Sequence, residues 1–106
     1  MLEVHLWLFG KVATFPKQQR FVLGQQIENS SLNCTRYIIE ANNARGAEAT
    51  IHRLRALNVE LEVLRGLLRI AFEMKFLNAR SLGYITKKID EVGKMTGGWT
   101  KKVRNA

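Results

Sequence analysis

The stretch LRALNVELEVLRGLLRIA, residues 54–71, decides the fold. Its leucines recur at alternating spacings of three and four residues, which is the pattern of a helix with one apolar seam. The seam consists of Leu54, Leu57, Leu61, Leu64, Leu68 and Ala71. A second apolar row beside it contains Val63, Leu67, Ile70, Met74 and Leu77. Two adjacent rows form a face wide enough to contact more than one neighbouring helix, as in a bundle.

Helical spacing continues on both sides of this stretch. The predicted helices cover residues 2–14, 17–45, 47–77 and 81–97. Pro16 separates the first two, because the residue before a proline is pushed out of helical geometry. Gly46 is expected to end the second helix. Short connections between long helices favour antiparallel neighbours, so the sequence predicts an all-α, up-and-down four-helix bundle in a single domain of 106 residues.

The last predicted helix starts near Ser81, a good N-cap. Its expected buried stripe is Leu82, Ile85, Ile89, Val92 and Met95. Gly97 and Gly98 are expected to end it and to leave a short basic tail over residues 99–106. Trp99 follows the glycines and either closes the end of the bundle or stacks on a base. Packing is the favoured interpretation.

Small residues lie on the core-facing side of the second predicted helix. They are Gly24, Ser30, Ser31 and Cys34, and they suggest that a neighbouring helix approaches closely there. Cys34 is the only cysteine, so no disulfide can form within the chain, and on a core face it is expected to act as a small hydrophobe. A reducing, cytoplasmic location is consistent with this cysteine usage.

The net charge of +8 is the most informative feature of the amino-acid composition. Residues 78–106 hold seven basic and only two acidic side chains. Lys87, Lys94 and Lys101 recur every seven residues and share one helical face, and Lys88, Lys102 and Arg104 enlarge the cluster. This excess of positive charge favours a polyanion as partner. Nucleic acid is the preferred candidate, and an anionic membrane surface is the second.

A second basic row lies on the third predicted helix. Arg65 and Arg69 are four residues apart on one face, and Arg55 lies two heptads before Arg69. Glu62 and Glu73 have the spacing to neutralise part of this row. A solvated face with ion pairs and a ligand-binding patch are equally consistent with the pattern.

No constellation of catalytic residues is present, so the chain is expected not to be an enzyme and to need no cofactor. The two histidines, His5 and His52, have no Cys, Asp or Glu at metal-ligand spacing, so no metal site is expected. No stretch has the length and apolar composition of a membrane span. Exposed apolar residues on the first and third helices suggest homo-oligomerisation, which leaves a structural oligomer or protein adaptor as a second functional hypothesis.

Five motifs, in this order and spacing, resemble one protein family over nearly the whole chain. They are Leu6-Trp7-Leu8-Phe9, Phe15-Pro16-Lys17-Gln18-Gln19-Arg20-Phe21-Val22-Leu23-Gly24, Ile39-Glu40-Ala41-Asn42-Asn43-Ala44-Arg45, Leu64-Arg65-Gly66-Leu67-Leu68-Arg69 and Ile89-Asp90-Glu91-Val92-Gly93-Lys94-Met95-Thr96-Gly97-Gly98-Trp99. The chain resembles the accessory variability determinants of diversity-generating retroelements. They belong to a wider group of four-helix bundles that includes proteins encoded in intervening sequences of bacterial ribosomal RNA genes.

The resemblance implies a four-helix bundle that assembles into a basic, pentameric barrel. It implies a non-catalytic accessory subunit that binds the reverse transcriptase of the same retroelement and nucleic acid, either the template RNA or complementary DNA, in mutagenic retrohoming. The basic residues of the matched motifs, Arg20, Arg65, Arg69 and Lys94, are then expected to contact nucleic acid or the reverse transcriptase. The ribosomal intervening-sequence branch, acting as a structural oligomer or adaptor, is the alternative.

Overall fold

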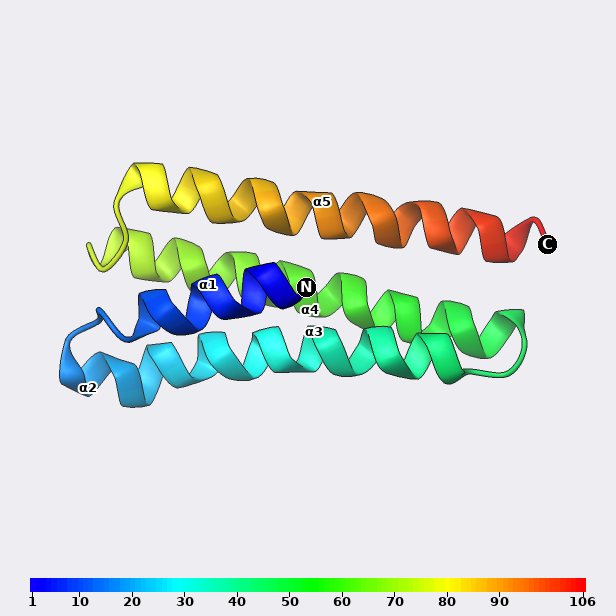
Figure 1. The fold of residues 1–106 in the computed structure, drawn as a ribbon, viewed down its shortest axis with the longest axis horizontal. Coiled ribbons are helices and arrows are strands. Elements are labelled where there is room, and N and C mark those ends of the chain that lie inside the picture. Colours follow the sequence, from blue (N-terminus) through cyan, green and yellow to red (C-terminus); the bar gives the residue numbers. More distant parts are fainter.

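The computed structural model describes all residues 1–106, and every regular element is helical. The elements are α1 (Leu2–Val12), α2 (Lys17–Gln19), the π-helix η1 (Arg20–Gly24), α3 (Gln25–Asn43), α4 (Ala47–Glu73) and α5 (Ala79–Arg104). The segments α2, η1 and α3 follow one another without a break and form one long helical rod. The helices run up and down in an elongated bundle of 47 × 23 × 19 Å (Figure 1).

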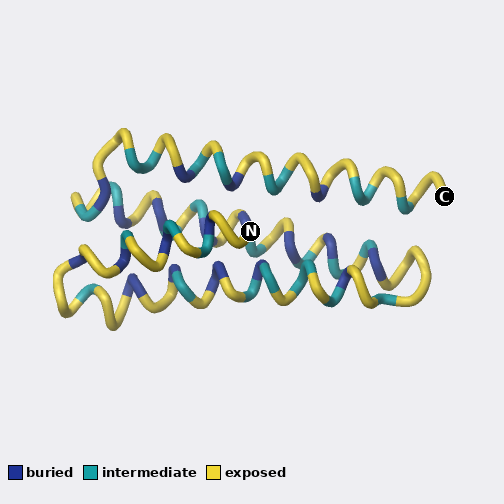
Figure 2. The backbone as a smooth tube through the Cα atoms, in the orientation of Figure 1, coloured by how far each residue is buried: buried dark blue, intermediate teal, exposed yellow.

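Helix α4 is the centre of the packing, because α3 and α5 flank it along most of its length (Figure 1). The predicted seam is confirmed: Leu54, Leu57, Leu61, Leu64, Leu68 and Ala71 are all buried. The shorter helix α1 packs on α3 and α5. Its buried side chains are Val4, Leu8 and Val12. The buried positions of α1, of the α2–η1–α3 rod, of α4 and of α5 accordingly lie on the sides that face the other helices (Figure 2).

The prediction that Gly97 and Gly98 end the last helix is wrong, since α5 continues through both to Arg104. A glycine inside a helix costs only about 1 kcal/mol relative to alanine. Beyond the two glycines Trp99 packs against the core, which favours the continued helix and confirms packing as the role of the indole. Residues 99–104 therefore form the last turns of a helix. Met95 is also not in the buried stripe; it is 74% exposed, and Thr96 is buried in its place.

The connection between α4 and α5 lies earlier than predicted. Helix α4 ends at Glu73 because Lys75 adopts a left-handed conformation, with φ of 67°, and the amide of Phe76 donates to the carbonyl of Ala71. Helix α5 begins at Ala79, and its cap is Asn78 rather than Ser81. The Asn78 side chain accepts a hydrogen bond from the Ser81 amide at 2.8 Å.

Small residues on the rod allow the close helix approach that the sequence predicted. Ser30 and Ser31 are buried, and His5 of α1 forms a 2.9 Å hydrogen bond with the hydroxyl of Ser31. Gly24, the last residue of the π-helix, is also buried. A Cβ atom built on Gly24 would lie only 2.5 Å from Cγ1 of Val12, so α1 reaches its position only because this residue is glycine.

Replacing Gly24 by alanine should therefore lower the free energy of unfolding by about 1–3 kcal/mol, because the added methyl forces α1 away. The matched control is Gly10→Ala in α1, where nothing lies within 4 Å of the added atom. That change should raise stability by roughly 0.5–1 kcal/mol. Urea unfolding followed by circular dichroism measures both. Equal effects of the two substitutions would contradict the close contact.

Cys34 of α3 is fully buried, next in sequence to Asn33, which belongs to a polar network between α3 and Glu60 of α4. Glu60 accepts hydrogen bonds from Ser30 at 2.7 Å and from Asn33 at 3.3 Å. Burial, followed by the nearby Glu60 carboxylate, raises the pKa of the Cys34 thiol from 9.0 to about 12. The thiol is thus protonated near neutral pH, as expected of a small hydrophobe.

The raised pKa predicts that stability falls at alkaline pH. Between pH 9.0 and about 12, Cys34 keeps its proton in the folded chain and loses it on unfolding, so a rise in pH favours the unfolded chain. Below pH 9.0 this contribution is fully present. Urea midpoints measured across this range for the wild type and for Cys34→Ala should differ in slope, with the shallower decline in the variant. Parallel curves would contradict the prediction.

Candidate nucleic-acid interface

A groove runs between α4 and α5 for most of their length. Four hollows form it, of about 780, 460, 600 and 490 Å³. The first two share Glu62, Arg65 and Asp90, the second and third share Asn58, and the last two share Arg55 and Arg104. Neighbouring hollows share lining residues, so they follow one another along the line between α4 and α5, and we call this row of hollows the α4–α5 groove.

The α4–α5 groove gathers basic side chains from both helices. They are Arg55, Arg65 and Arg69 from α4, and Lys87, Lys94, Lys101 and Arg104 from α5. Its acidic residues are Glu48, Glu62 and Asp90. Among the basic residues, only Arg65 and Arg69 form salt bridges. The other five cations are free to meet the phosphates of a polyanion.

Arg65 joins the two walls of the groove. Its guanidinium pairs with Glu62 on the same helix and with Asp90 on α5, where Nη2 lies 3.0 Å from Oδ1. The side chain is 27% exposed. Arg65 therefore helps to hold α4 and α5 together, and it offers less free charge to a ligand than its neighbours.

Arg69 lies beside an aromatic ring in the largest hollow of the groove. Its Nη2 atom pairs with Glu73 at 2.9 Å, and its Cζ atom lies 5.5 Å from the ring centroid of Phe72. Glu62 and Glu73, which were expected to neutralise part of this row, pair with Arg65 and Arg69 respectively. Both pairs are exposed, so each contributes little to stability.

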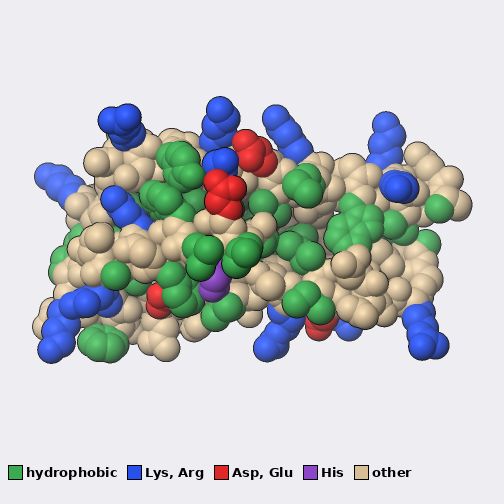
Figure 3. All heavy atoms as spheres, viewed as in Figure 1, with side chains coloured by type: hydrophobic (Ala, Val, Ile, Leu, Met, Phe, Trp, Pro, Cys, Tyr) green, Lys and Arg blue, Asp and Glu red, His purple; other side chains and the backbone are tan.

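Two predicted site residues of α5 lie outside the groove. Lys88 faces α1, where its Nζ atom lies 3.2 Å from Oε1 of Glu3, and this hydrogen bond raises the pKa of the lysine. Lys102 is exposed but lines none of the four hollows. The face that carries α1 shows hydrophobic side chains along its middle and Lys and Arg mainly at its edges (Figure 3).

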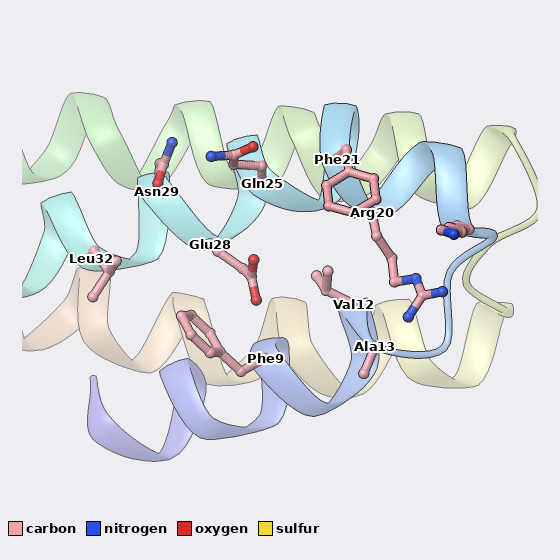
Figure 4. Close-up of a pocket in the computed structure, with 10 residues that line it drawn as sticks. Phe9, Val12, Ala13, Arg20, Phe21, Gln25, Glu28, Asn29 and Leu32 are labelled. Carbon is pink, nitrogen blue, oxygen red and sulfur yellow. The ribbon is translucent and has the colours of Figure 1, made fainter.

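Arg20 belongs to a separate hollow of about 590 Å³ between α1 and the start of the long rod. Phe9 faces this hollow from α1 and Glu28 reaches toward it from α3, with Arg20 near the α1–α2 turn (Figure 4). Phe21 lines it and is 70% exposed. With its exposed aromatic rings, this hollow differs in chemistry from the groove.

Sequence reasoning did not assign Arg55 to the site, although it lies two heptads before Arg69. In the structure Arg55 lines the same hollow as Lys101 and Arg104, because α4 and α5 run antiparallel and bring the start of one beside the end of the other. Only the pairing of the two helices reveals this neighbour.

The fold and the groove define a class: a small, all-helical, bundle-type protein with a basic groove between two long helices. The model of the bAvd-like family, proteins like the accessory variability determinant, matches residues 2–103, and the chain belongs to this family. This confirms the resemblance seen in the sequence motifs. No curated protein and no solved structure matches the chain.

The side chains bring together no group of three or more His, Cys, Asp or Glu residues suited to hold a metal ion. None of the helices combines the length and apolar composition that crossing a membrane requires.

Proposed function

We propose that this chain is a non-catalytic accessory subunit of a diversity-generating retroelement, which binds nucleic acid and the reverse transcriptase during mutagenic retrohoming. Membership in the bAvd-like family supports the retroelement assignment. The observation that carries the nucleic-acid part is the α4–α5 groove, whose hollows are lined by five unpaired cations. Lysine and arginine bind phosphates and release counterions, and this drives sequence-independent affinity.

A different surface suits a protein partner. Phe9 of α1, Phe21 of the π-helix and Leu32 of α3 line one hollow and are 39%, 70% and 48% exposed. Exposed apolar side chains in such number mark an interaction surface. We assign Arg20 and the hollow between α1 and η1 to contact with the reverse transcriptase.

Exposed apolar residues on α4 support self-assembly. Val59, Val63, Ile70 and Met74 recur at helical spacing and are between 46% and 65% exposed. A homo-oligomer, in the pentameric form that the family resemblance implies, would cover them. Multi-angle light scattering of the purified protein would measure the subunit count, and a monomer at every concentration would contradict the assembly.

Co-purification tests the proposed function. The chain, co-expressed with a tagged reverse transcriptase of the same retroelement, should remain bound after nuclease treatment, which removes nucleic-acid bridges. Phe21→Asp should abolish this complex because it replaces the exposed aromatic ring that lines the hollow by a charge. The control Val22→Asp changes a neighbour of similar exposure that does not line the hollow. Failure of the wild-type chain to bind would contradict the accessory role.

The alternative function is that of a structural oligomer or protein adaptor, as in the ribosomal intervening-sequence branch. The exposed apolar residues of α4 favour it as much as they favour self-assembly of a retroelement subunit. An oligomer that binds neither nucleic acid nor reverse transcriptase would support this alternative.

A further inference from the structure

We infer that the α4–α5 groove takes a single-stranded nucleic acid rather than a duplex, and that one base of the strand enters the hollow lined by Phe72. This inference rests on the proposed nucleic-acid binding and specifies the form of the ligand. The hollow is the largest of the groove, at about 780 Å³, and Arg69 and Lys87 also line it.

The position of the cations favours a thin ligand. The groove follows the line where α4 and α5 pack on each other, so cations of both helices reach it from opposite sides. Arg65, at 27% exposure, lies within it, and Arg55 and Lys94 line it from opposite helices. A single strand can lie along the groove and bring phosphates to both walls. A rigid duplex that lies on the groove would present its phosphates to the outermost side chains but no unpaired base to the Phe72 hollow.

The chemistry of the largest hollow favours an unpaired base. Phe72 and Leu82 give it an apolar wall within an otherwise charged groove. The Arg69 guanidinium, 5.5 Å from the Phe72 ring centroid, adds a second flat, cationic group. Aromatic rings and arginine planes beside a basic track are how single strands are bound without sequence preference. In a duplex the bases are stacked on one another and unavailable to the ring.

Glycines in the groove provide a way to test this placement. Gly66 and Gly83 line the Phe72 hollow, and a Cβ atom added at either would meet nothing within 4 Å. The fold therefore does not require glycine at these positions, and glycine is a poor residue for a helix interior. A larger side chain there should stabilise the helix while it obstructs a strand in the groove.

The experiment compares an unstructured, fluorescein-labelled RNA of about 20 nucleotides with its duplex, by fluorescence anisotropy at one salt concentration. The wild type should bind the single strand about tenfold more tightly than the duplex. Gly83→Leu and Gly66→Leu should each weaken single-strand binding about tenfold, with thermal midpoints at or above that of the wild type. Gly98→Leu is the control, since Gly98 is equally open but lines none of the hollows.

Phe72→Leu separates the contribution of the base to the affinity from the contribution of the phosphate backbone. It keeps an apolar side chain against the core but removes the aromatic face, so single-strand affinity should fall about tenfold and duplex affinity should not change. The inference would be overturned if the wild type bound the duplex as tightly as the single strand or more tightly. It would also be overturned if Gly66→Leu and Gly83→Leu both kept full single-strand affinity. Either result would leave nucleic-acid binding itself intact. The absence of all RNA binding by the wild type would instead overturn the proposed function, and this inference with it.

Discussion

Changing Lys87 and Lys94 together to glutamate should weaken the binding of single-stranded RNA on the order of a hundredfold at about 0.1 M salt. Both lysines line the α4–α5 groove, and neither has an acidic partner in the chain. The change removes two cations and puts two negative charges against the phosphates. The slope of log K against log salt should also become shallower by about 1.4, which corresponds to two lost single-strand phosphate contacts.

The matched control reverses two exposed cations outside the groove, Lys17 and Arg36. Each double variant lowers the net charge by four, from +8 to +4, so long-range attraction is weakened equally in both. Because Lys17 and Arg36 line none of the groove's hollows, the control should lose much less affinity. Equal losses in the two double variants would show that only overall charge matters and would contradict a defined binding groove.

The substitution Leu64→Ala should lower the free energy of unfolding by about 2–5 kcal/mol. Leu64 is fully buried in the α4 seam, where a smaller side chain leaves a cavity. Since small domains are stable by only roughly 5–15 kcal/mol, this one change removes a large share of the total. Urea unfolding at pH 7 would measure the effect.

Met95→Ala is the control for this prediction. Met95 lies on α5 and is 74% exposed, so the change should stay within about 0.5 kcal/mol of the wild type. A loss at Met95 as large as that at Leu64 would contradict the assignment of the seam as the core of the bundle.

Periodicity was sufficient to predict the helical rods because the burial of a seam such as Leu54 to Ala71 depends mainly on local spacing. Helix ends were less predictable because they depend on tertiary contacts and on backbone geometry. Helix α5 passes Gly97 and Gly98 because Trp99 packs on the core beyond them. Helix α4 stops at Glu73 because Lys75 turns left-handed, and lysine gives no indication of this in the sequence.

The candidate site was predictable as a charge cluster but not as a surface. Lys87 and Lys88 are consecutive in the sequence, yet one lines the groove and the other pairs with Glu3 of α1. Arg55 joins Lys101 only because α4 and α5 are antiparallel neighbours. Such assignments require knowing which helix lies beside which face, and spacing within one helix does not contain that information.

A salt titration of the wild-type protein with single-stranded RNA tests the central claim, binding of nucleic acid by the basic groove, most directly. With two to five phosphates meeting the five unpaired cations, the plot of log K against log salt should be linear with a slope between about −1.4 and −3.5. No binding at about 50 mM salt, or an affinity that salt does not change, would contradict the claim.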